Sequence, residues 1–336
     1  MSEAMTPVAV GIDDGFAATK IALPDGRLVV IPSCGRLGNS GVTWVTSAKG
    51  DIAEYETEGS RYAVGAVAGE STRFESYPVS GLNRAIVQHA LQRAGLGGRT
   101  LHAVSGLPVS AYYHPDGSKR TSAIDAKRTS LLTRVACVNG LLPAELAFHG
   151  VIPEALAAWY DYVIDDDEAE PTLDSERATR PVAIVDIGGR TTDYVVVRDQ
   201  GLVHAASGSV RVGILDMTSQ VSGAILKRFD LETLDERIVT AALETGTLRL
   251  FGVDHDVTAL LEDAKRTFVE ALHNATQRKL GRGSEVDTVY FVGGGAVLLA
   301  DEVRDWFPHQ AIAPHPAFAN ARGMLKYLRY VCDDDA

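Results

Sequence analysis

Short apolar runs near the start of the chain are interrupted by residues that favour turns. Val8–Ile12 is β-rich and is followed by Asp13-Asp14-Gly15, which predicts that a strand ends there. Two similar runs, Thr19–Leu23 and Leu28–Ile31, follow, with Pro24-Asp25-Gly26 between them. The pattern therefore predicts an antiparallel meander of three strands.

Helical and strand-like patterns then alternate along the rest of the chain. Apolar residues at helical spacing predict helices, and short β-rich runs predict strands. The predicted helices are Leu82–Ala94, Ala123–Val135, Pro153–Val163, Val212–Phe229, Val257–Leu280 and Ala321–Tyr330. The further predicted strands include Val42–Val45, Tyr62–Val64, Leu101–Ser105, Val182–Val185, Tyr194–Val197 and Val289–Val292. This mixture indicates an α/β fold.

One turn pattern occurs twice. Asp13 is followed by a glycine two positions later and a threonine six positions later, and Asp186 has the same spacing. The offset, 186 − 13 = 173 residues, is about half of the 336-residue chain. A repeat at half the chain length predicts two similar domains that face each other, with a ligand in the cleft between them.

Both turns carry residue types suited to phosphate binding. Small residues let backbone N–H groups approach phosphate oxygens closely. Two strand-end carboxylates suit Mg²⁺, which takes few protein ligands beside phosphate oxygens, and a lysine in the return strand can reach a phosphate. These candidates are Gly15, Ala17, Gly188, Gly189 and Thr191 for the backbone, Asp13 and Asp186 for Mg²⁺, and Lys20 for phosphate. An ordinary β-hairpin can carry the same Asp and Gly residues, so either turn alone is weak support. The occurrence of two such turns favours a phosphate-binding site.

Three consecutive glycines, Gly293-Gly294-Gly295, follow a predicted strand and open a helix. Such a segment can pack flat against a base or ribose, or bind an anion at the helix N-terminus. A tight strand-to-helix turn explains the same glycines, so they gain weight only together with the two hairpins.

Composition and charge narrow the possible roles. A formal net charge of −12 argues against general nucleic-acid binding. Three separated cysteines do not predict a disulfide framework. No apolar run approaches the ~20 residues of a membrane span, so we expect a soluble protein that does not contact membranes.

An acidic segment, Asp165–Glu170 followed by Pro171, is the clearest change in composition and reads as a solvated loop or linker. The resulting division is a first domain at 1–164 with a small subdomain at about 35–95, a linker at 165–180, and a second domain at 181–336 with a small subdomain at about 225–285.

The motifs together resemble the actin, sugar kinase and heat-shock chaperone ATPase superfamily, and within it the ParM/StbA family of bacterial plasmid segregation proteins. The matching segments are Gly11–Lys20 and Val185–Asp193 for the phosphate motifs, Phe291–Ala296 for the adenosine motif, and Leu107–Tyr113, Ile152–Ala155 and Gly323-Met324 for family-specific segments. The resemblance extends in motif order from about residue 8 to residue 330.

This resemblance implies an actin-like fold of two RNase H-like domains, each with an inserted subdomain, and a nucleotide cleft between them. It implies a cytoplasmic bacterial ATPase that polymerises head to tail on binding Mg-ATP, and whose hydrolysis destabilises the filament. A DNA-binding adaptor protein would connect the filament to plasmid DNA, without direct DNA binding. ATP is the expected nucleotide, with GTP left open because no motif reads the base.

The resemblance also implies roles for particular residues. Glu154 is the candidate that orients or deprotonates the attacking water, together with Asp186 as the second catalytic residue; the alternative for Glu154 is an acid placed in the first turn of a helix. Asp193 is expected to order the second hairpin. The predicted nucleotide-binding residues are Asp13, Asp14, Gly15, Phe16, Ala17, Lys20, Gly188, Gly189, Arg190, Thr191, Thr192, Gly213, Gly293, Gly294 and Gly295.

Some positions depart from the family pattern or leave the assignment open. Arg190 stands where many relatives have a small hydroxyl residue, and Ala17 where a small polar residue is common. Glu262, Lys265 and Arg266 are candidates to cover the ribose, which a solvated helix face explains equally well. The alternative functions are a small-molecule kinase of the sugar kinase type and a bacterial actin-like scaffold that does not segregate DNA.

Overall fold

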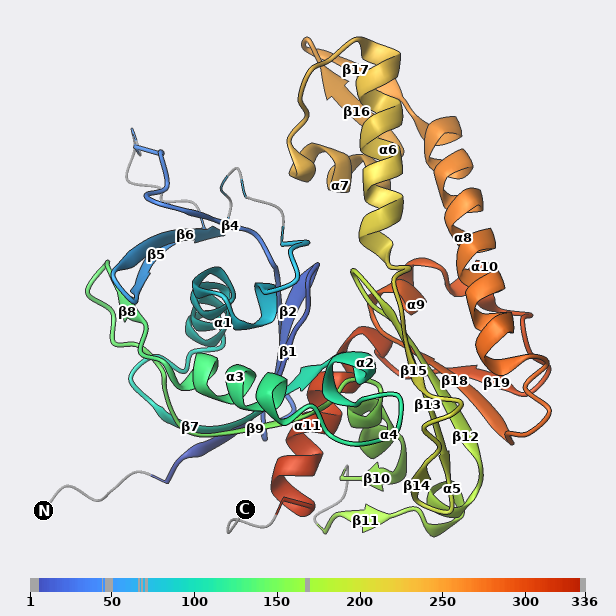
Figure 1. The fold of residues 1–336 in the computed structure, drawn as a ribbon. Helices are drawn as coiled ribbons and strands as arrows, with labels where there is room; N and C mark the ends of the chain where they lie inside the picture. Colours follow the sequence, from blue (N-terminus) through green and yellow to red (C-terminus); the bar gives the residue numbers. More distant parts are fainter. Residues whose placement is uncertain are drawn as a thin grey trace, which may run out of the picture.

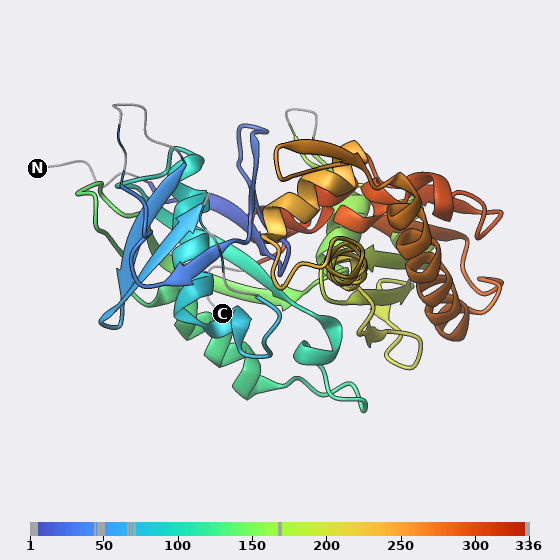
Figure 2. The ribbon, with the colours of Figure 1, turned by 90° about the horizontal axis from the view of Figure 1, so that it is seen from above.

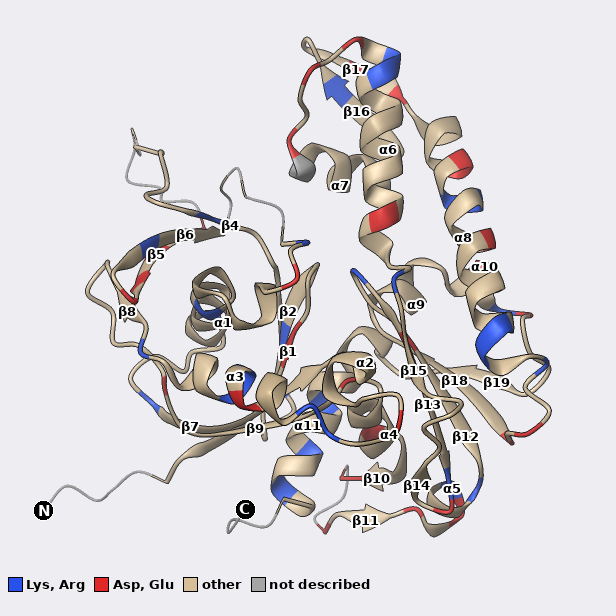
Figure 3. Ribbon diagram, in the orientation of Figure 1, with Lys and Arg blue, Asp and Glu red and all other residues tan. Residues whose placement is uncertain are grey.

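A computed structural model describes residues 6–43, 45, 51–65, 67, 69, 72–166 and 170–332. Two main β-sheets organise these residues, one in each half of the chain (Figure 1). Seen from above, the two halves lie side by side (Figure 2). Lys and Arg positions alternate with Asp and Glu positions along the ribbon of both halves (Figure 3). Among the described helices, none has the length and apolar character that crossing a membrane requires.

The first main sheet has the strand order β3-β2-β1-β7-β9. Its strands are β1 (Val8–Asp14), β2 (Ala18–Ala22), β3 (Leu28–Pro32), β7 (Thr100–Leu107) and β9 (Glu145–Pro153). The first three are antiparallel, as the meander predicts, whereas β7 runs parallel to both β1 and β9. The turn between β1 and β2 therefore lies at the end of β1, at the edge where β7 and β9 also end.

The second main sheet repeats this arrangement, with the order β14-β13-β12-β18-β19 and β15 paired with β13. Its strands are β12 (Val182–Ile187), β13 (Thr192–Arg198), β14 (Gly201–Leu202), β15 (Gly208–Val210), β18 (Thr288–Val292) and β19 (Gln310–Ile312). Strands β12 and β13 are antiparallel, as β1 and β2 are. Strands β12 and β18 are parallel, as β1 and β7 are. The sequence repeat is thus a repeat of strand pairing.

A smaller unit accompanies each main sheet. In the first half, β4 (Gly35–Leu37), β5 (Ile52–Thr57), β6 (Ser60–Gly65) and β8 (Ala136–Cys137) form a four-stranded sheet packed on α1 (Gly81–Arg93). In the second half, the smaller unit consists of α6 (Ile214–Phe229), α7 (Glu236–Thr245), β16 (Thr247–Leu250), β17 (Val253–Asp256) and α8 (Thr258–Leu280). The long helices α6 and α8 extend away from the second sheet (Figure 1).

The remaining elements connect and cover the sheets. They are η1 (Tyr77–Val79), α2 (Val109–Tyr112), α3 (Thr121–Leu132), α4 (Leu156–Val163), β10 (Ile164–Asp165), β11 (Thr172–Leu173), α5 (Ser175–Thr179), α9 (Gly294–Leu298), α10 (Ala300–Val303), η2 (Pro316–Phe318) and α11 (Ala319–Tyr330). Helix α4 contributes Ala158 and Trp159 to a core shared with the second sheet, and Ala157 to one shared with the first. Met324 of α11 lies in the latter core, so α4 and α11 join the two halves.

Three sequence expectations differ from the structure. The helix expected at Pro153–Val163 begins at Leu156, because Pro153 still pairs in β9 and Ala155 adopts a positive φ of 61° that breaks the helix. A strand was expected at Val42–Val45, but Val42 and Thr43 form none.

The acidic segment is also more ordered than a linker. Ile164–Asp165 pairs with Thr172–Leu173 as a two-stranded hairpin, and a short helix follows. Asp174 caps this helix, because its side chain accepts a hydrogen bond of 2.9 Å from the backbone N–H of Arg177. Residues 167–169 of the expected linker lie outside the described residues.

Candidate functional site

The turns after β1 and β12 face each other across a cavity of about 230 Å³. Each turn comes at the end of a buried strand, so the equivalent ends of the two sheets build the two walls. The cavity is lined by Asp13, Gly15, Phe16, Ala17, Ala18, Lys20, Glu154, Asp186, Gly188, Gly189, Arg190, Thr191, Asp193, Ile214, Gly293, Gly294, Gly295 and Asn320. The structure therefore brings together most of the predicted nucleotide site.

Close approach of the two hairpins depends on glycine. A Cβ atom added to Gly189 would lie 2.8 Å from the Cβ of Ala17, too close for two carbon atoms. At Gly293, whose φ is 89°, an added Cβ would lie 2.3 Å from Oδ1 of Asp186. Glycine at both positions leaves the backbone exposed to the cavity, which is what binding of a phosphate chain by N–H groups needs.

Asp14, which the sequence placed in the nucleotide site, points away from the cavity. Its carboxylate accepts hydrogen bonds from Asn83 Nδ2, at 2.8 Å, and from Nζ of the fully buried Lys127. Successive side chains of a strand point to opposite faces, so Asp13 and Asp14 cannot both face the cleft. Asp14 instead anchors β1 to α1 and α3.

Thr192 and Gly213 also lie behind the cavity wall. The Thr192 side chain is buried, and its hydroxyl donates to the carbonyl of Val212 at 2.7 Å. Gly213 precedes α6, and an added Cβ there would lie 2.4 Å from the carbonyl oxygen of Gly189. Both residues hold α6 against the second hairpin.

Asp13 and Lys20 form an ion pair within the first hairpin. Lys20 Nζ lies 3.0 Å from Asp13 Oδ2, and both side chains are nearly buried. Burial lowers the pKa of Lys20, but the charge and hydrogen bond of Asp13, with the charges of Asp186 and Glu154, outweigh it, so the pKa is raised. Lys20 is thus a fixed positive charge in the cavity.

Asp186 and Asp193 of the second hairpin accept hydrogen bonds from uncharged donors. Asn320 Nδ2 donates to Asp186 Oδ2 at 2.7 Å. Burial raises the pKa of Asp186 to about 7, and the charges of Asp193 and Asp13 add to this effect. The Asp186 carboxyl is therefore poised to change protonation near neutral pH.

Asp193 ties the second hairpin to the first half of the chain. Its Oδ1 accepts from the backbone N–H of Val109 at 2.7 Å and from the Ser209 hydroxyl, and its Oδ2 accepts from the Thr191 hydroxyl at 2.9 Å. Burial raises the pKa of Asp193, while these hydrogen bonds oppose the shift. Besides lining the cavity, Asp193 holds the two halves in register.

Glu154 lies in a tight turn between β9 and α4. Its backbone N–H donates to the Leu107 carbonyl at 2.8 Å, and its own carbonyl accepts from the N–H of Leu156 at 2.7 Å. Burial raises the pKa of Glu154 well above its usual range, and the nearby Asp193, Asp13 and Asp186 raise it further. Because Glu154 precedes α4 by two residues, it is not a first-turn helix acid.

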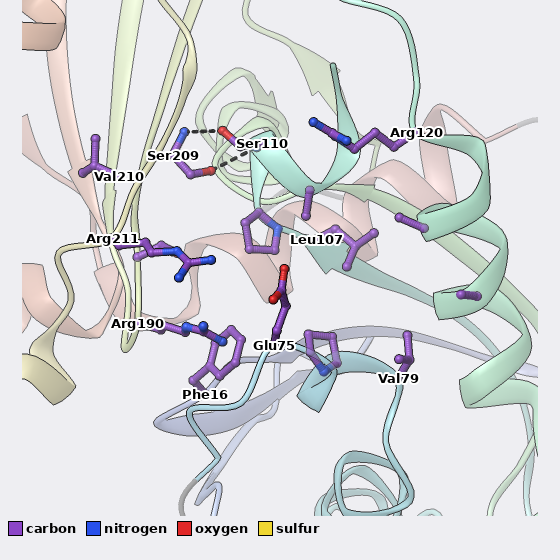
Figure 4. Close-up of a pocket in the computed structure, with 16 residues that line it drawn as sticks. Phe16, Glu75, Val79, Leu107, Ser110, Arg120, Arg190, Ser209, Val210 and Arg211 are labelled. Atoms are coloured by element: carbon purple, nitrogen blue, oxygen red, sulfur yellow. Dashed lines mark hydrogen bonds between the residues drawn. The ribbon is translucent and has the colours of Figure 1, made fainter. Parts of the chain in front are cut away.

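Arg190 contacts the opposite hairpin through Phe16. The Arg190 guanidinium carbon lies 5.1 Å from the centre of the Phe16 ring, which is cation–π distance. These two residues and Thr191 also border a second cavity of about 550 Å³, between α2, α3 and β15 (Figure 4). Ser110 and Ser209 exchange two hydrogen bonds, of 3.0 and 2.8 Å, beside it. The Phe16–Arg190 pair thus separates the two cavities.

The donor set fits Mg²⁺ held partly through water. Among the described residues, no cluster of three or more His, Cys, Asp or Glu side chains forms a metal site. Asp13 contacts Lys20 through Oδ2, Asp186 contacts Asn320 through Oδ2, and both aspartates face the same cavity. Two carboxylates beside phosphate oxygens and water are the coordination that Mg²⁺ favours.

The three candidates for the ribose line a different cavity, of about 520 Å³, between α8 and α10. Lys265 forms an ion pair there with Glu302, and Glu262 and Arg266 stand beside it. This cavity shares no lining residue with the phosphate cavity.

Asn320 is the polar residue of the cavity wall that the sequence analysis missed. It lies 134 residues from Asp186 along the chain, and no motif of the analysis includes it. Asn320 directly precedes the predicted helix Ala321–Tyr330, and an asparagine at that position indicates a helix start but not a contact with Asp186.

Two family models match successive parts of the chain. The model for the N-terminal part of the plasmid segregation protein ParM matches residues 8–165. The model for the C-terminal part of archaeal, MreB-like actin homologues matches residues 184–305. An archaeal actin homologue of Thermoplasma volcanium is 23% identical over 350 residues, with 94% of this chain and 97% of the homologue covered. The Thermoplasma acidophilum homologue is 24% identical, with the same coverage.

Solved structures share the fold. A ParM protein in a 15-stranded filament from Clostridium botulinum superposes with a TM-score of 0.74 at 18% identity, covering 96% of this chain and 99% of that one. An archaeal actin homologue in complex with ADP superposes with a TM-score of 0.72 at 18% identity and the same coverage. The paired sheets and these superpositions confirm the predicted actin-like fold, and the two family models together with the superpositions support a ParM-like protein of the actin family.

Proposed function

We propose that this protein binds Mg-ATP between its two hairpins, hydrolyses it, and forms filaments whose stability depends on the bound nucleotide. The observation that carries the proposal is the cavity between two equivalent turns, which has exposed glycine backbone on both walls and Lys20 inside. The ADP complex of the archaeal homologue supports a nucleotide ligand. GTP is the alternative nucleotide, since no residue of the cavity has been identified that would distinguish adenine from guanine.

The phosphate chain is proposed to lie between Gly15–Ala17 and Gly188–Thr191, whose N–H groups would hold its oxygens. Lys20 would supply a positive charge that Asp13 keeps in place. Mg²⁺, when bound near Asp13 and Asp186, supplies positive charge that compensates the phosphates. Gly293–Gly295 would pack against the nucleoside.

Glu154 is proposed to orient the attacking water and accept its proton. Burial and the neighbouring acids raise the pKa of Glu154, which makes its carboxylate a stronger proton acceptor than an exposed carboxylate. Asp186 would act beside it as the second catalytic carboxylate, positioned by Asn320. Phosphoryl transfer needs mainly such positioning and charge compensation.

We further propose that residues 1–164 and 181–336 are the two domains that nucleotide binding would draw together, with subdomains at about 35–95 and 225–285. Helix α11 lies in the second of these ranges but packs on β1 through Ala321 and Leu325. It therefore belongs structurally with the first sheet, although the chain reaches it last.

Self-assembly is proposed to be head to tail, since such contacts do not close on themselves and give open filaments. The filament of the Clostridium botulinum ParM protein supports assembly of this fold. A cytoplasmic bacterial role in plasmid segregation would require a DNA-binding adaptor, because a net charge of −12 disfavours direct contact with DNA.

Right-angle light scattering after addition of Mg-ATP tests this proposal, with Asp186→Ala as the control. We expect scattering to rise and then decay as phosphate appears, and the variant to show neither change. Absence of a rise at high protein concentration, with phosphate transfer to an added sugar or other metabolite, would instead favour the kinase alternative.

A second candidate is an actin-like scaffold that does not segregate DNA. It is favoured by the archaeal actin homologues and by the MreB-like model that matches residues 184–305. Filaments that assemble but are not stabilised by any DNA-bound protein from the same genetic locus would support the scaffold over plasmid segregation.

A further inference from the structure

Asn320 uses both ends of its side-chain amide at the site. Its Nδ2 donates to Asp186 Oδ2 at 2.7 Å, and its Oδ1 accepts from the backbone N–H of Ala155 at 3.0 Å. The side chain is buried in the first turn of α11 and borders the cavity. One amide group therefore connects the second hairpin with the residue that follows Glu154.

The Ala155 end of this connection is strained. Ala155 has φ 61° and ψ −37°, a conformation that L-residues seldom adopt, and it is fully buried. Surrounding contacts must hold such a residue in place, and the Asn320 amide supplies the hydrogen bond of its N–H group. Because Glu154 is the preceding residue, the same contact restrains the direction of the Glu154 side chain.

Helix α11 is held too tightly for Asn320 to shift. A Cβ added to Gly323 would lie 1.7 Å from the Ala157 carbonyl oxygen, so α11 and α4 touch backbone to backbone. On the other side, a Cβ added to Gly11 of β1 would lie 1.9 Å from the Ala321 carbonyl oxygen. Arg322 also binds Asp161 of α4 through Nε, at 3.0 and 3.1 Å from the two carboxylate oxygens.

We propose that Asn320 is a positioning residue that fixes Asp186 and the turn carrying Glu154 relative to each other across the phosphate cavity. This inference rests on the proposed ATP hydrolysis. The carboxylates of Asp186 and Glu154 come from different halves of the chain, and both face Asp13, Asp193 and the cation Lys20. Asn320 connects the two acids by one hydrogen bond to the Asp186 carboxylate and one to the turn that carries Glu154.

Two substitutions separate the two ends of the bridge. Asn320→Asp keeps an oxygen that accepts from the Ala155 N–H but loses the donor to Asp186. Asn320→Ala loses both contacts. Removing a partner that orients a reactive group commonly lowers activity about 10- to 100-fold, and we expect a loss of kcat in this range for both variants.

The readouts are steady-state ATP hydrolysis, ADP affinity in the presence of EDTA, and hydrogen exchange of the Ala155 amide. We expect kcat to fall while ADP affinity without Mg²⁺ stays within about threefold of wild type, because positioning acts on the reacting groups and not on uniform binding. Exchange at Ala155 should accelerate in Asn320→Ala and remain near wild type in Asn320→Asp.

Asn83→Ala is the matched control, since Asn83 is a buried asparagine that also donates to an aspartate, Asp14, at 2.8 Å, but outside the cavity. We expect it to affect stability and leave exchange at Ala155 unchanged. The inference is overturned if both Asn320 variants keep kcat, or if kcat and Mg-free ADP affinity fall in proportion. If wild-type protein does not hydrolyse ATP, the proposed function fails, whereas exchange at Ala155 still reports whether the bridge exists.

Discussion

The two hairpins have the same backbone arrangement but different electrostatics. In the first, each aspartate is paired with a lysine: Asp13 with Lys20 and Asp14 with Lys127. In the second, Asp186 and Asp193 accept only from amide, hydroxyl and backbone N–H donors among the described residues. The charge of the first hairpin is therefore compensated by lysines of the protein, whereas the acids of the second accept only uncharged donors and suit a cation such as the proposed Mg²⁺.

This difference indicates different roles for the acids of the two hairpins. Asp14 fixes β1 to α1 and α3, whereas Asp13 holds Lys20 in the cavity. The unpaired acids stand with Glu154 in a buried cluster, where burial and mutual repulsion raise the pKa values of Asp186, Asp193 and Glu154. Groups with pKa values raised in this way are typical of functional sites.

The largest expected effect is on hydrolysis when the second hairpin loses its acid. We expect Asp186→Asn to lower kcat by at least about 100-fold, the loss that removal of an important electrostatic group commonly causes. Phosphate release measured with Mg-ATP checks this. The matched control is Asp199→Asn, at an exposed turn of the same half, and equal activity of both variants would remove Asp186 from the mechanism.

The next largest expected effect is a loss of unfolding free energy when the first hairpin loses a lysine. Lys127→Met leaves the buried Asp14 carboxylate without its cation, and breaking a buried pair costs about 3–5 kcal/mol of unfolding free energy. Urea denaturation measures the loss. The comparison is Lys20→Met, which we expect to cost less because the Lys20 side chain keeps 13% of its surface exposed whereas Lys127 is fully buried. Equal losses would contradict the assignment of Asp14 as the anchoring residue.

Stability should also depend on pH through the second hairpin. The pKa of Asp186 is raised from 3.8 to about 7 on folding, so the folded protein binds this proton more tightly than the unfolded chain. The resulting stabilisation is complete below pH 3.8 and is lost as the pH rises through 7. In the absence of nucleotide, Asp186→Asn should therefore stabilise the protein at pH 8 by roughly 4 kcal/mol, since the pKa rises from 3.8 to about 7.

Urea denaturation at pH 8 and at pH 4 checks this prediction, since the gain should disappear at the acidic value, where the wild-type carboxyl is protonated. A variant that is less stable than wild type at pH 8 would show that Asp186 is compensated within the folded protein.

The smallest expected effect concerns the contact between the hairpins. A double-mutant cycle with Phe16→Leu and Arg190→Thr should give a coupling energy of about 1 kcal/mol in thermal or urea unfolding, the size of a partly desolvated cation–π contact. Additive effects of the two substitutions would show that the hairpins touch without this interaction.

The two hairpins could be predicted from the sequence because each depends on neighbouring residues, namely turn-forming Asp and Gly and a spacing that occurs twice. Sequence reasoning also placed Asp13, Lys20, Glu154 and Asp186 at one cavity. Its error at Asp14 was avoidable, because side-chain alternation allows only one of two adjacent strand residues to face the cleft.

The start of α4 and the role of Asn320 were not predictable in the same way. The first depends on the strained backbone of Ala155, which pairing with the neighbouring strand and helix enforces. The second depends on two hydrogen bonds between residues 134 and 165 positions apart, which no local pattern encodes.

The most direct test of the central claim combines scattering and phosphate release for Glu154→Gln and wild type after addition of Mg-ATP. We predict that wild-type scattering rises and decays while phosphate accumulates. The variant should assemble to a similar level, release phosphate at least about 100 times more slowly, and remain assembled. A variant that hydrolyses ATP at the wild-type rate, or wild-type protein that neither assembles nor releases phosphate, would contradict the account.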